Sequence, residues 1–177
     1  STGSLGHGMS IAVGTALAAR VLGKDYITYV VLGDGECDEG SNWEAAMSAS
    51  HYKLKNMRSF VDRNKCMIDG RTEDVMKLEP FADKWRAFGF IVKEIDGNNI
   101  AELCDAIDFA LANVNDPESD KPVMIICDTL KGCGIDFIED NYLWHYGAFD
   151  DEKYAKAKEA LKNSYAKRVA RAEKEGK

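Results

Sequence analysis

The sequence lacks the features of several protein classes. No apolar run approaches the roughly 20 residues that a membrane-spanning helix needs, so we expect no membrane contact. The first residues do not have the pattern of a secretory signal. The five cysteines are odd in number and form no C-x-x-C pair, which predicts reduced thiols in a cytoplasmic protein rather than disulfides or a zinc site. A G-x-x-x-x-G-K-[ST] nucleotide loop is also missing.

Positive charge is scarce over most of the chain. The formal net charge of −7 divides into +4 for residues 151–177, which hold nine Lys/Arg and five Asp/Glu, and −11 for residues 1–150. A body this acidic predicts no nucleic-acid binding, because phosphate backbones repel it. We interpret residues 1–150 as one binding domain and residues 151–177 as a charged C-terminal helix or linker with a solvated face.

Apolar runs alternate with helix-like stretches along the domain. We expect strands at 26–32, 57–62, 90–95 and 123–127, and helices at 7–22, 40–54, 79–88, 99–113 and 151–174. The strand at 26–32 has no polar alternation, which predicts a strand covered on both faces. Residues 131–150 are rich in glycine and aromatics and predict a long functional loop. The fold class we expect is α/β, with a doubly wound, mainly parallel sheet and helices on both faces.

One carboxylate and one carboxamide follow two neighbouring predicted strands. Asp34 lies within Gly33-Asp34-Gly35 after the first strand, and Asn64 follows the second strand 30 positions later. The carboxyl ends of parallel strands open on one edge of a sheet, so we expect these two side chains to meet there. A hard cation such as Mg²⁺ binds one or two protein oxygens and completes its shell with phosphate oxygens and water. The pattern therefore predicts a metal–diphosphate site.

Three glycines near the start invite a dinucleotide interpretation that fails. Gly3, Gly6 and Gly8 have the spacing G-x-x-G-x-G, and no strand precedes them here, whereas the fingerprint needs G-x-G-x-x-G after a strand. A glycine-rich loop that opens a helix without a ligand is one alternative. The other is an anion site, because the helix N-terminus at this point suits negative charge.

The sequence resembles the thiamine diphosphate enzymes, whose binding motif is GDG followed by an asparagine about thirty residues later. Further segments narrow the resemblance to transketolase. These segments are Thr2 to Gly8, Gly33-Asp34-Gly35-Glu36 with Glu39-Gly40, Trp43-Glu44-Ala45-Ala46, His51-Tyr52-Lys53-Leu54, and Asp62-Arg63-Asn64 through Ile68-Asp69-Gly70. The forms Gly3-Ser4-Leu5 and Trp144-His145 are closer to the split type, whose halves are separate chains. The resemblance covers roughly residues 1–150 and implies the diphosphate-binding domain.

The resemblance implies a set of metal and diphosphate contacts. Asp34, the Asn64 side chain and the backbone carbonyl of Cys66 would bind Mg²⁺ or Ca²⁺. Asn64, Gly33 and Gly35 would also contact thiamine diphosphate, with backbone N–H groups near Gly35 meeting phosphate oxygens. The implied reaction transfers a two-carbon ketol unit between sugar phosphates.

Further residues take cofactor roles only through the resemblance. Gly3 and Leu5 would line the cofactor pocket, and Ile68 would pack against the thiazolium. His145 would form a hydrogen bond with the diphosphate near the substrate channel and is counted as catalytic. Its register is less well matched, because Tyr146 separates it from the following glycine.

Two glutamates carry an implied role between subunits. Glu39 and Glu44 match buried glutamates at the dimer interface that form a proton path between sites, and are counted as catalytic. An alternative is that both are ordinary acids near a helix N-terminus, where the helix dipole favours them. The implied assembly is a homodimer or a heterotetramer.

Several parts of the family pattern depart from this sequence or lie outside it. Cys66 and Lys131 stand where the family commonly has aliphatic residues. The chain opens without a methionine, so we expect a processed start or a fragment. The pyrimidine-binding domain, which supplies the activating glutamate, has no counterpart here. We therefore expect turnover only with a partner, either a pyrimidine-binding domain or a C-terminal subunit.

Two other functions stay open from the sequence. One is a sibling thiamine diphosphate enzyme, such as a 1-deoxyxylulose-phosphate synthase or a 2-oxo acid dehydrogenase subunit. The other is a cofactor-binding module without turnover. The blocks at 51–54 and 68–70 favour transketolase over its siblings.

Overall fold

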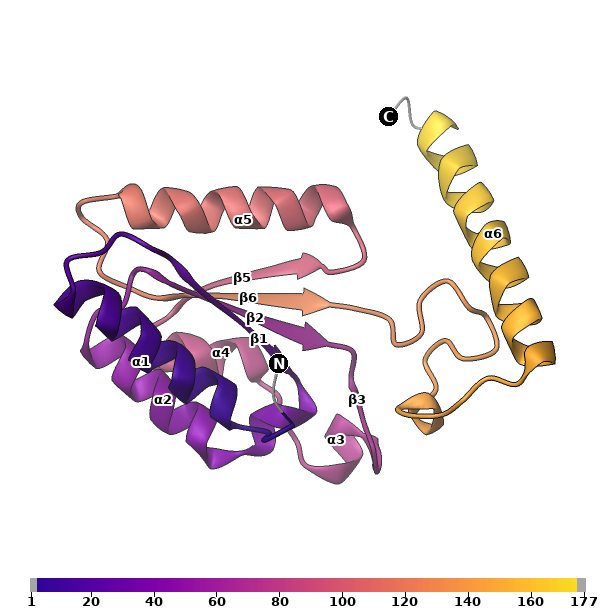
Figure 1. The fold of residues 1–177 in the computed structure, drawn as a ribbon, viewed down its shortest axis with the longest axis horizontal. Helices are drawn as coiled ribbons and strands as arrows, with labels where there is room; N and C mark the ends of the chain where they lie inside the picture. Colours follow the sequence, from indigo (N-terminus) through magenta and orange to yellow (C-terminus); the bar gives the residue numbers. More distant parts are fainter. Residues whose placement is uncertain (1–2, 175–177) are drawn as a thin grey trace.

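A computed structural model of the chain describes residues 3–174 and is built on a four-stranded parallel sheet (Figure 1). The strands lie in the order β1–β2–β6–β5, and each neighbouring pair is parallel. Their bounds are β1 (Thr28–Gly33), β2 (Met57–Arg63), β6 (Val123–Asp128) and β5 (Ile91–Asp96). A separate antiparallel hairpin joins β3 (Cys66–Met67) to β4 (Gly70–Arg71).

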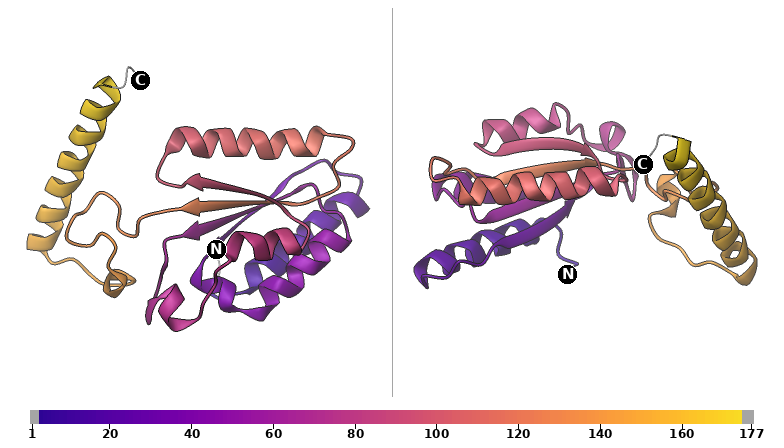
Figure 2. Two further views of the ribbon diagram at one scale, coloured as in Figure 1. Left: turned by 180° about the vertical axis from the view of Figure 1, so that it is seen from behind. Right: turned by 90° about the horizontal axis from the view of Figure 1, so that it is seen from above.

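Helices cover both faces of the sheet, as Figure 2 shows from two sides. One face carries α1 (His7–Val21), α2 (Gly40–His51) and α4 (Phe81–Ala87), whereas the other carries α5 (Ile100–Asn115). Short elements are η1 (Gly35–Asp38), α3 (Thr72–Val75) and η2 (Tyr142–Trp144). The predicted α/β class with a parallel, doubly wound sheet is therefore confirmed.

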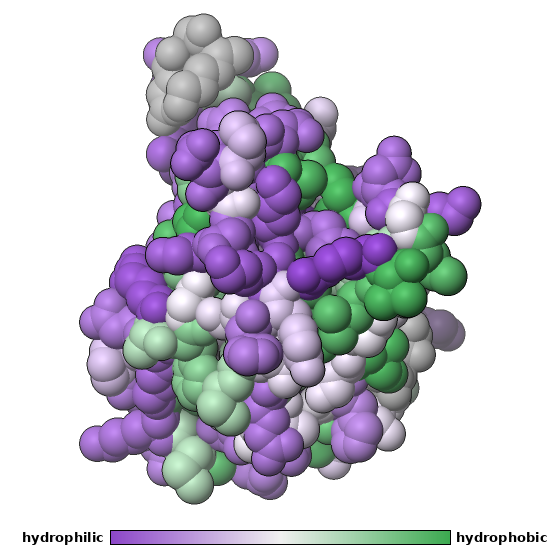
Figure 3. All heavy atoms as spheres, turned by 90° about the vertical axis from the view of Figure 1, so that its left-hand side faces the viewer, coloured by the Kyte–Doolittle hydropathy of each residue, from purple (hydrophilic) through white to green (hydrophobic). Residues whose placement is uncertain are grey.

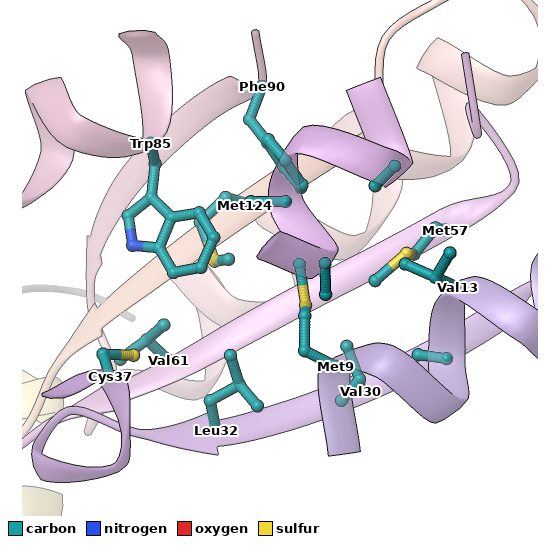
Figure 4. Close-up of a cluster of buried hydrophobic side chains, with 14 of the residues drawn as sticks. Met9, Val13, Val30, Leu32, Cys37, Met57, Val61, Trp85, Phe90 and Met124 are labelled. Atoms are coloured by element: carbon teal, nitrogen blue, oxygen red, sulfur yellow. The ribbon is translucent and has the colours of Figure 1, made fainter. Parts of the chain in front are cut away.

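The larger hydrophobic core lies between the sheet and the helices α1, α2 and α4 (Figure 4). Met9 from α1 and Trp85 from α4 are both completely buried against the strand residues Leu32, Met57 and Met124. These strand side chains share one face because successive residues of a strand point to opposite sides. A smaller cluster packs under α5, around Phe60, Ile125 and Ala106 among others.

The expectation that the first strand is covered on both faces is wrong for this chain. β1 lies at the edge of the sheet, and its burial alternates along the strand. Tyr29 and Val31 point away from α1 and are 51% and 71% exposed. The reason is that α5 packs on β5 and β6 at the opposite edge and leaves this face of β1 open. At the end of α1, Val21 and Leu22 are also exposed. Figure 3 shows the molecule from the left-hand side of Figure 1, where apolar side chains lie among polar ones.

The C-terminal segment lies beyond the carboxyl ends of the strands. A long loop follows β6 and leads into α6 (Asp151–Lys174), which stands apart from the sheet (Figure 1). The helix is anchored where Ala157 is buried, and where Arg168 donates from Nη2 to the Asn98 carbonyl at 3.1 Å. Among the described residues, no helix is long and apolar enough to cross a membrane.

Candidate functional site

The site forms at the carboxyl edge of the sheet, where β1 and β2 end side by side. Gly33 is paired with Asp62, and the Asp34 amide donates to the Asp62 carbonyl at 3.2 Å. The chain after β2 then turns back, so that the Lys65 amide donates to Asp34 Oδ2 at 2.6 Å. The structure thus brings the Asp34 carboxylate against the loop that carries Asn64, as the spacing of the two strands predicts.

The Asp34 carboxylate is buried and held by three donors. It is only 1% exposed. Oδ1 accepts from the Gly35 amide at 2.8 Å, whereas Oδ2 accepts from the Lys65 amide and from Arg63 Nη1 at 3.0 Å. Burial raises the pKa of this carboxyl above its ordinary value, and the hydrogen bonds from Lys65, Arg63 and Gly35 oppose that shift. The orientation of the carboxylate is therefore set by the protein.

Asn64 and Cys66 are joined by a local turn beside this carboxylate. Asn64 Oδ1 accepts from the Cys66 amide at 3.0 Å, and Asn64 Nδ2 donates to Asp62 Oδ2 at 3.3 Å. The Cys66 thiol is buried, and burial raises its pKa. A thiol that keeps its proton is a poor metal ligand, so the backbone carbonyl of Cys66 is the better candidate.

The donor chemistry fits a hard divalent cation. One carboxylate, one carboxamide oxygen and one backbone carbonyl form an all-oxygen set. A carboxylate has about four acceptor positions, and Asp34 uses three of them, which leaves room for a metal ion. Within residues 3–174 there is no cluster of three or more His, Cys, Asp or Glu side chains that could hold a metal ion, so a metal here would depend on this mixed set of oxygens.

Gly35 of the Gly33-Asp34-Gly35 turn is required for close packing. A Cβ atom on Gly35 would lie 2.9 Å from Met67 Cβ in the β3–β4 hairpin, so no side chain fits there. The Gly33 amide donates to Glu36 Oε2 at 3.1 Å, and the Gly35 amide is bound to Asp34. Both amides therefore have acceptors within the chain in this structure, and the contact of Gly35 with the diphosphate stays a prediction.

Glu36 is a residue that the sequence interpretation missed as part of the site. Its carboxylate accepts from the Gly33 amide and, through Oε1, from the Gly6 amide at 3.0 Å. The Ser41 hydroxyl donates to the Gly6 carbonyl at 2.8 Å. Gly6 has φ of 79°, where glycine is favoured, and a Cβ there would meet Ser41 Oγ at 2.5 Å. These bonds fix the glycine-rich loop before α1 against the turn after β1.

Several residues assigned through the resemblance lie exposed. Glu39 and Glu44 lie at and near the start of α2, with exposed side chains. Leu5 is 56% and Ile68 is 53% exposed, and Gly3 and His145 are exposed too. Their predicted roles all require a ligand or a partner subunit that would cover them.

Two hollows open at the same edge, and Asn64 lines both. The larger, of about 880 Å³, also contains Lys65, Arg71, Asp128 and Asp140. The smaller, of about 350 Å³, has Asp62, Asn98 and Lys131 among its lining residues. Asp34 belongs to neither lining, because Arg63 and the loop after β2 cover it. Asn64 thus lies on the open surface of this edge, whereas Asp34 does not.

Ion pairs across this edge join segments far apart in sequence. Lys65 Nζ lies 2.8 Å from Asp128 Oδ1, which links the end of β2 with the end of β6. Arg71 binds both carboxylate oxygens of Asp140, at 2.5 and 2.7 Å, which links β4 with the long loop. No local pattern in the sequence predicts these ion pairs.

The long loop after β6 has a small aromatic core of its own. The rings of Phe137, Trp144 and Phe149 lie with centroids 5.4–6.1 Å apart in tilted and edge-on arrangements. Such pairs add stability beyond their buried area. The loop that carries His145 is therefore ordered by its own side chains.

Comparison with known proteins identifies the family. The family described as "Transketolase, thiamine diphosphate binding domain" matches residues 1–173. The chain is 40% identical over 178 residues to one subunit of the apulose-4-phosphate transketolase of Phocaeicola vulgatus, covering 99% of this chain and 59% of the relative. It is 42% identical over 176 residues to one subunit of the 6-deoxy-6-sulfo-D-fructose transketolase of a Clostridium species, covering 99% and 58%. The chain thus spans less than two thirds of these relatives.

Solved structures agree with the sequence comparison. The transketolase of Campylobacter jejuni superposes with a TM-score of 0.81 at 31% identity, covering 90% of this chain and 25% of that one. A transketolase from Leishmania mexicana gives a TM-score of 0.70 at 27% identity, covering 96% and 29%.

Proposed function

The chain belongs to the transketolase family as a thiamine diphosphate-binding domain, and we propose that it anchors the diphosphate of this cofactor through Mg²⁺ or Ca²⁺ within a two-subunit transketolase. The observation that carries this proposal is the meeting of Asp34 and the Asn64 loop at the ends of two adjacent parallel strands. Family membership supports thiamine diphosphate as the cofactor, and the set of oxygen donors supports a hard cation as its anchor.

Three groups of this chain would hold the metal: the Asp34 carboxylate, the Asn64 side-chain oxygen and the Cys66 carbonyl. The bound cofactor would supply a stabilised carbanion for carbon–carbon bond cleavage and formation. Asp34 would offset the charge of the cation from a buried position, where electrostatic interactions are stronger than in water. The tight Gly33-Asp34-Gly35 turn would let the backbone come close to the diphosphate.

The exposed residues around the turn would complete the cofactor pocket. Gly3, Leu5 and Ile68 would contact the cofactor, and His145, on the ordered loop, would form a hydrogen bond with the diphosphate. Their exposure in this chain supports the idea that something else covers them. Residues 151–177 would follow the binding domain of residues 1–150 as a charged helix.

A partner subunit would supply the pyrimidine-binding half of the site. The similar proteins of Phocaeicola and Clostridium are named as subunits, which supports a split enzyme. Glu39 and Glu44 would lie at the contact between cofactor-binding halves, in a homodimer or heterotetramer, and carry protons between sites. The substrates would be phosphorylated or similarly acidic sugars that exchange a two-carbon ketol unit.

The experiment is a titration of the full-length protein, assembled with its partner subunit, with thiamine diphosphate and Mg²⁺. Asp34→Ala should abolish metal-dependent cofactor binding; because it also removes the buried partner of Arg63, it should lower the free energy of unfolding, and circular dichroism checks that the variant is folded under the conditions of the titration. Asn64→Ala should weaken binding less, since a neutral ligand contributes less than a carboxylate. Unchanged cofactor affinity in Asp34→Ala would contradict the metal assignment.

The separate chain should show no ketol transfer. In the proposed division the partner subunit supplies the pyrimidine-binding half, and the proton transfer that activates the cofactor is worth about 10²–10⁴-fold in rate. Turnover of sugar phosphates by this chain alone would show that the proposed division between subunits is wrong.

A further inference from the structure

Arg63 makes side-chain hydrogen bonds to four different residues, and neither the sequence pattern nor the proposed metal site accounts for them. It is the last residue of β2 and is only 4% exposed. Its side chain points to the face of the sheet that α1, α2 and α4 cover, and its guanidinium carbon lies 5.4 Å from the centre of the Phe81 ring. Burying a charge at this depth is costly unless hydrogen bonds compensate.

The two terminal nitrogens of the Arg63 guanidinium each donate to two acceptors. Nη1 donates to Asp34 Oδ2 at 3.0 Å and to the Thr72 hydroxyl at 2.8 Å. Nη2 donates to Glu73 Oε1 at 3.1 Å and to Glu79 Oε1 at 2.8 Å. One side chain thus connects the candidate metal ligand with the segment that contains α3 and the turn before α4.

The acceptors on the far side are themselves fixed. Glu73 Oε1 also accepts from the Leu78 amide at 3.1 Å, and Glu79 Oε2 accepts from the Phe81 amide at 2.8 Å. The Thr72 side chain is completely buried, and its amide donates to the Lys65 carbonyl. Arg63 therefore rests on a rigid frame and can hold Asp34 in one orientation.

The charges around Arg63 do not balance. Asp34, Glu73 and Glu79 bring three negative charges to one guanidinium, a formal sum of −2. Lys84, which lowers the pKa of Glu79, offsets part of this charge, and a cation at Asp34 would offset more of it. Arg63 therefore leaves the electrostatic requirement for a metal ion in place, and its contribution is geometric.

The donors on Asp34 are divided unequally between its two carboxylate oxygens. Oδ2 already accepts from both Arg63 and the Lys65 amide, whereas Oδ1 accepts only from the Gly35 amide. Oδ1 is thus the oxygen with more acceptor capacity to spare.

We propose that Arg63 is a positioning residue for the metal: it occupies Oδ2 of Asp34 from a frame formed by Thr72, Glu73 and Glu79, so that Oδ1 faces the cation. This inference rests on the proposed function. It makes the segment from Thr72 to Phe81 part of the metal site, although none of its side chains touches the metal.

The test is Arg63→Lys in the full-length protein assembled with its partner subunit. The substitution keeps the charge and removes the planar fork, and a single ammonium cannot serve both Asp34 and the two glutamates. Affinity for Mn²⁺, measured by calorimetry without substrate and well below the unfolding temperature, should fall about tenfold or more, as for other residues that orient metal ligands. The Mn²⁺ requirement for thiamine diphosphate binding should rise in parallel.

Arg58→Lys is the matched control. Arg58 lies on the same strand, is completely buried, and is five positions away, about 17 Å along a strand. The same substitution there should leave Mn²⁺ affinity within twofold of the wild type. Equal losses of affinity in both variants would mean that general damage to β2 is responsible and would overturn the proposal.

A second variant covers the case in which Arg63→Lys does not fold. Thr72→Val preserves size and charge but removes the hydroxyl that shares Nη1 with Asp34, and should weaken Mn²⁺ binding severalfold. Its control is Thr28→Val, because Thr28 is also buried and its hydroxyl has no hydrogen-bond partner. Identical Mn²⁺ affinities in Thr72→Val and Thr28→Val would overturn the proposal.

The wild type separates this inference from the proposed function. A wild-type assembly that binds neither Mn²⁺ nor thiamine diphosphate would overturn the proposed function, and with it this inference. If the wild type binds both and Arg63→Lys binds Mn²⁺ equally or more tightly, the proposed function stands and the role of Arg63 is refuted.

Discussion

Strand β2 buries an arginine at each end, and the two are satisfied in opposite ways. At its carboxyl end, Arg63 makes hydrogen bonds to three carboxylates and one hydroxyl. Near its amino end, Arg58 donates from Nη1 to the carbonyls of Lys55 and Met57, while Nε and Nη2 have no partner. Both side chains are buried. Burial alone therefore does not explain the cluster of charges at the carboxyl edge.

The pKa values of the two arginines diverge for the same reason. Burial lowers the pKa of Arg58 to about 10, because little nearby favours its charged form. Burial would also lower the pKa of Arg63, but hydrogen bonds to Glu79 and Asp34 raise it above its ordinary value. At the amino edge of the sheet, the buried Arg58 has few hydrogen-bond partners. At the carboxyl edge, the buried Arg63 has a carboxylate or hydroxyl acceptor for each of its bonds.

The largest expected effect is the loss of stability in Arg63→Met. The substitution leaves the buried Asp34 carboxylate without its cation, and removing one partner of a buried pair costs about 3–5 kcal/mol. Since Glu73 and Glu79 are partly exposed, we expect the lower end, about 3 kcal/mol. Urea unfolding of the metal-free protein at pH 7 measures it.

Arg58→Met tests whether the two arginines of β2 differ in their contribution to stability. Methionine fills a similar volume and removes a charge that is incompletely paired, so the free energy of unfolding should change by less than about 1 kcal/mol or rise slightly. A loss as large as that of Arg63→Met would show that both ends of β2 depend on their arginines equally.

A smaller effect is expected from Gly35→Ala. The new Cβ would lie 2.9 Å from Met67 Cβ, and this atom cannot move without the β3–β4 hairpin. Overpacking of this kind costs about 1–3 kcal/mol in unfolding free energy. Thermal unfolding should show the loss, and cofactor titration should show weaker binding.

Gly14→Ala is the control for Gly35→Ala. Gly14 lies inside α1, and a Cβ there would meet nothing within 4 Å. Alanine in a helix interior should stabilise the protein by about 0.5–1 kcal/mol. Equal behaviour of the two variants would mean that the turn after β1 is not tightly packed.

The smallest effect concerns the pH dependence of Glu79. The hydrogen bond from Arg63, followed by the one from the Phe81 amide, lowers the pKa of Glu79 below its ordinary 4.5. A lowered folded-state pKa stabilises the protein above the unfolded value, and this stability is lost as the pH falls through the folded value. Because the side chain is 57% exposed, the effect should be only a few tenths of a kcal/mol.

Acid unfolding of Glu79→Gln measures this difference. Between pH about 5 and 3 the variant should lose less stability than the wild type, since it has no carboxylate to protonate at this position. Glu94→Gln is the control, because it removes the same charge from a surface pair with Arg86. A steeper acid loss in Glu79→Gln than in the wild type would contradict the assignment of this stability to the Arg63 network.

Local sequence patterns determined the order of the elements. The four strands of the main sheet and the five longer helices begin and end within a few residues of the predicted ranges, whereas the short elements β3, β4 and α3 were not predicted; the fold class is the expected one. Apolar runs and helical spacing are local signals, because each residue's environment in a strand or helix repeats with a short period. The position of Asp34 against the loop that carries Asn64 follows from the same logic, since parallel strands joined by one helix end on one edge.

Only the tertiary structure decided which partners the site residues have. Glu36 bridges Gly6 and Gly33, Arg63 joins Asp34 to Glu79, and Arg71 holds Asp140 across 69 positions. The structure also showed that one face of β1 is open, which a continuous apolar run does not predict. The sequence by itself determines periodicity and strand-end chemistry because these are short-range properties. Contacts between distant segments depend on how whole elements pack, and only the folded chain brings those side chains together.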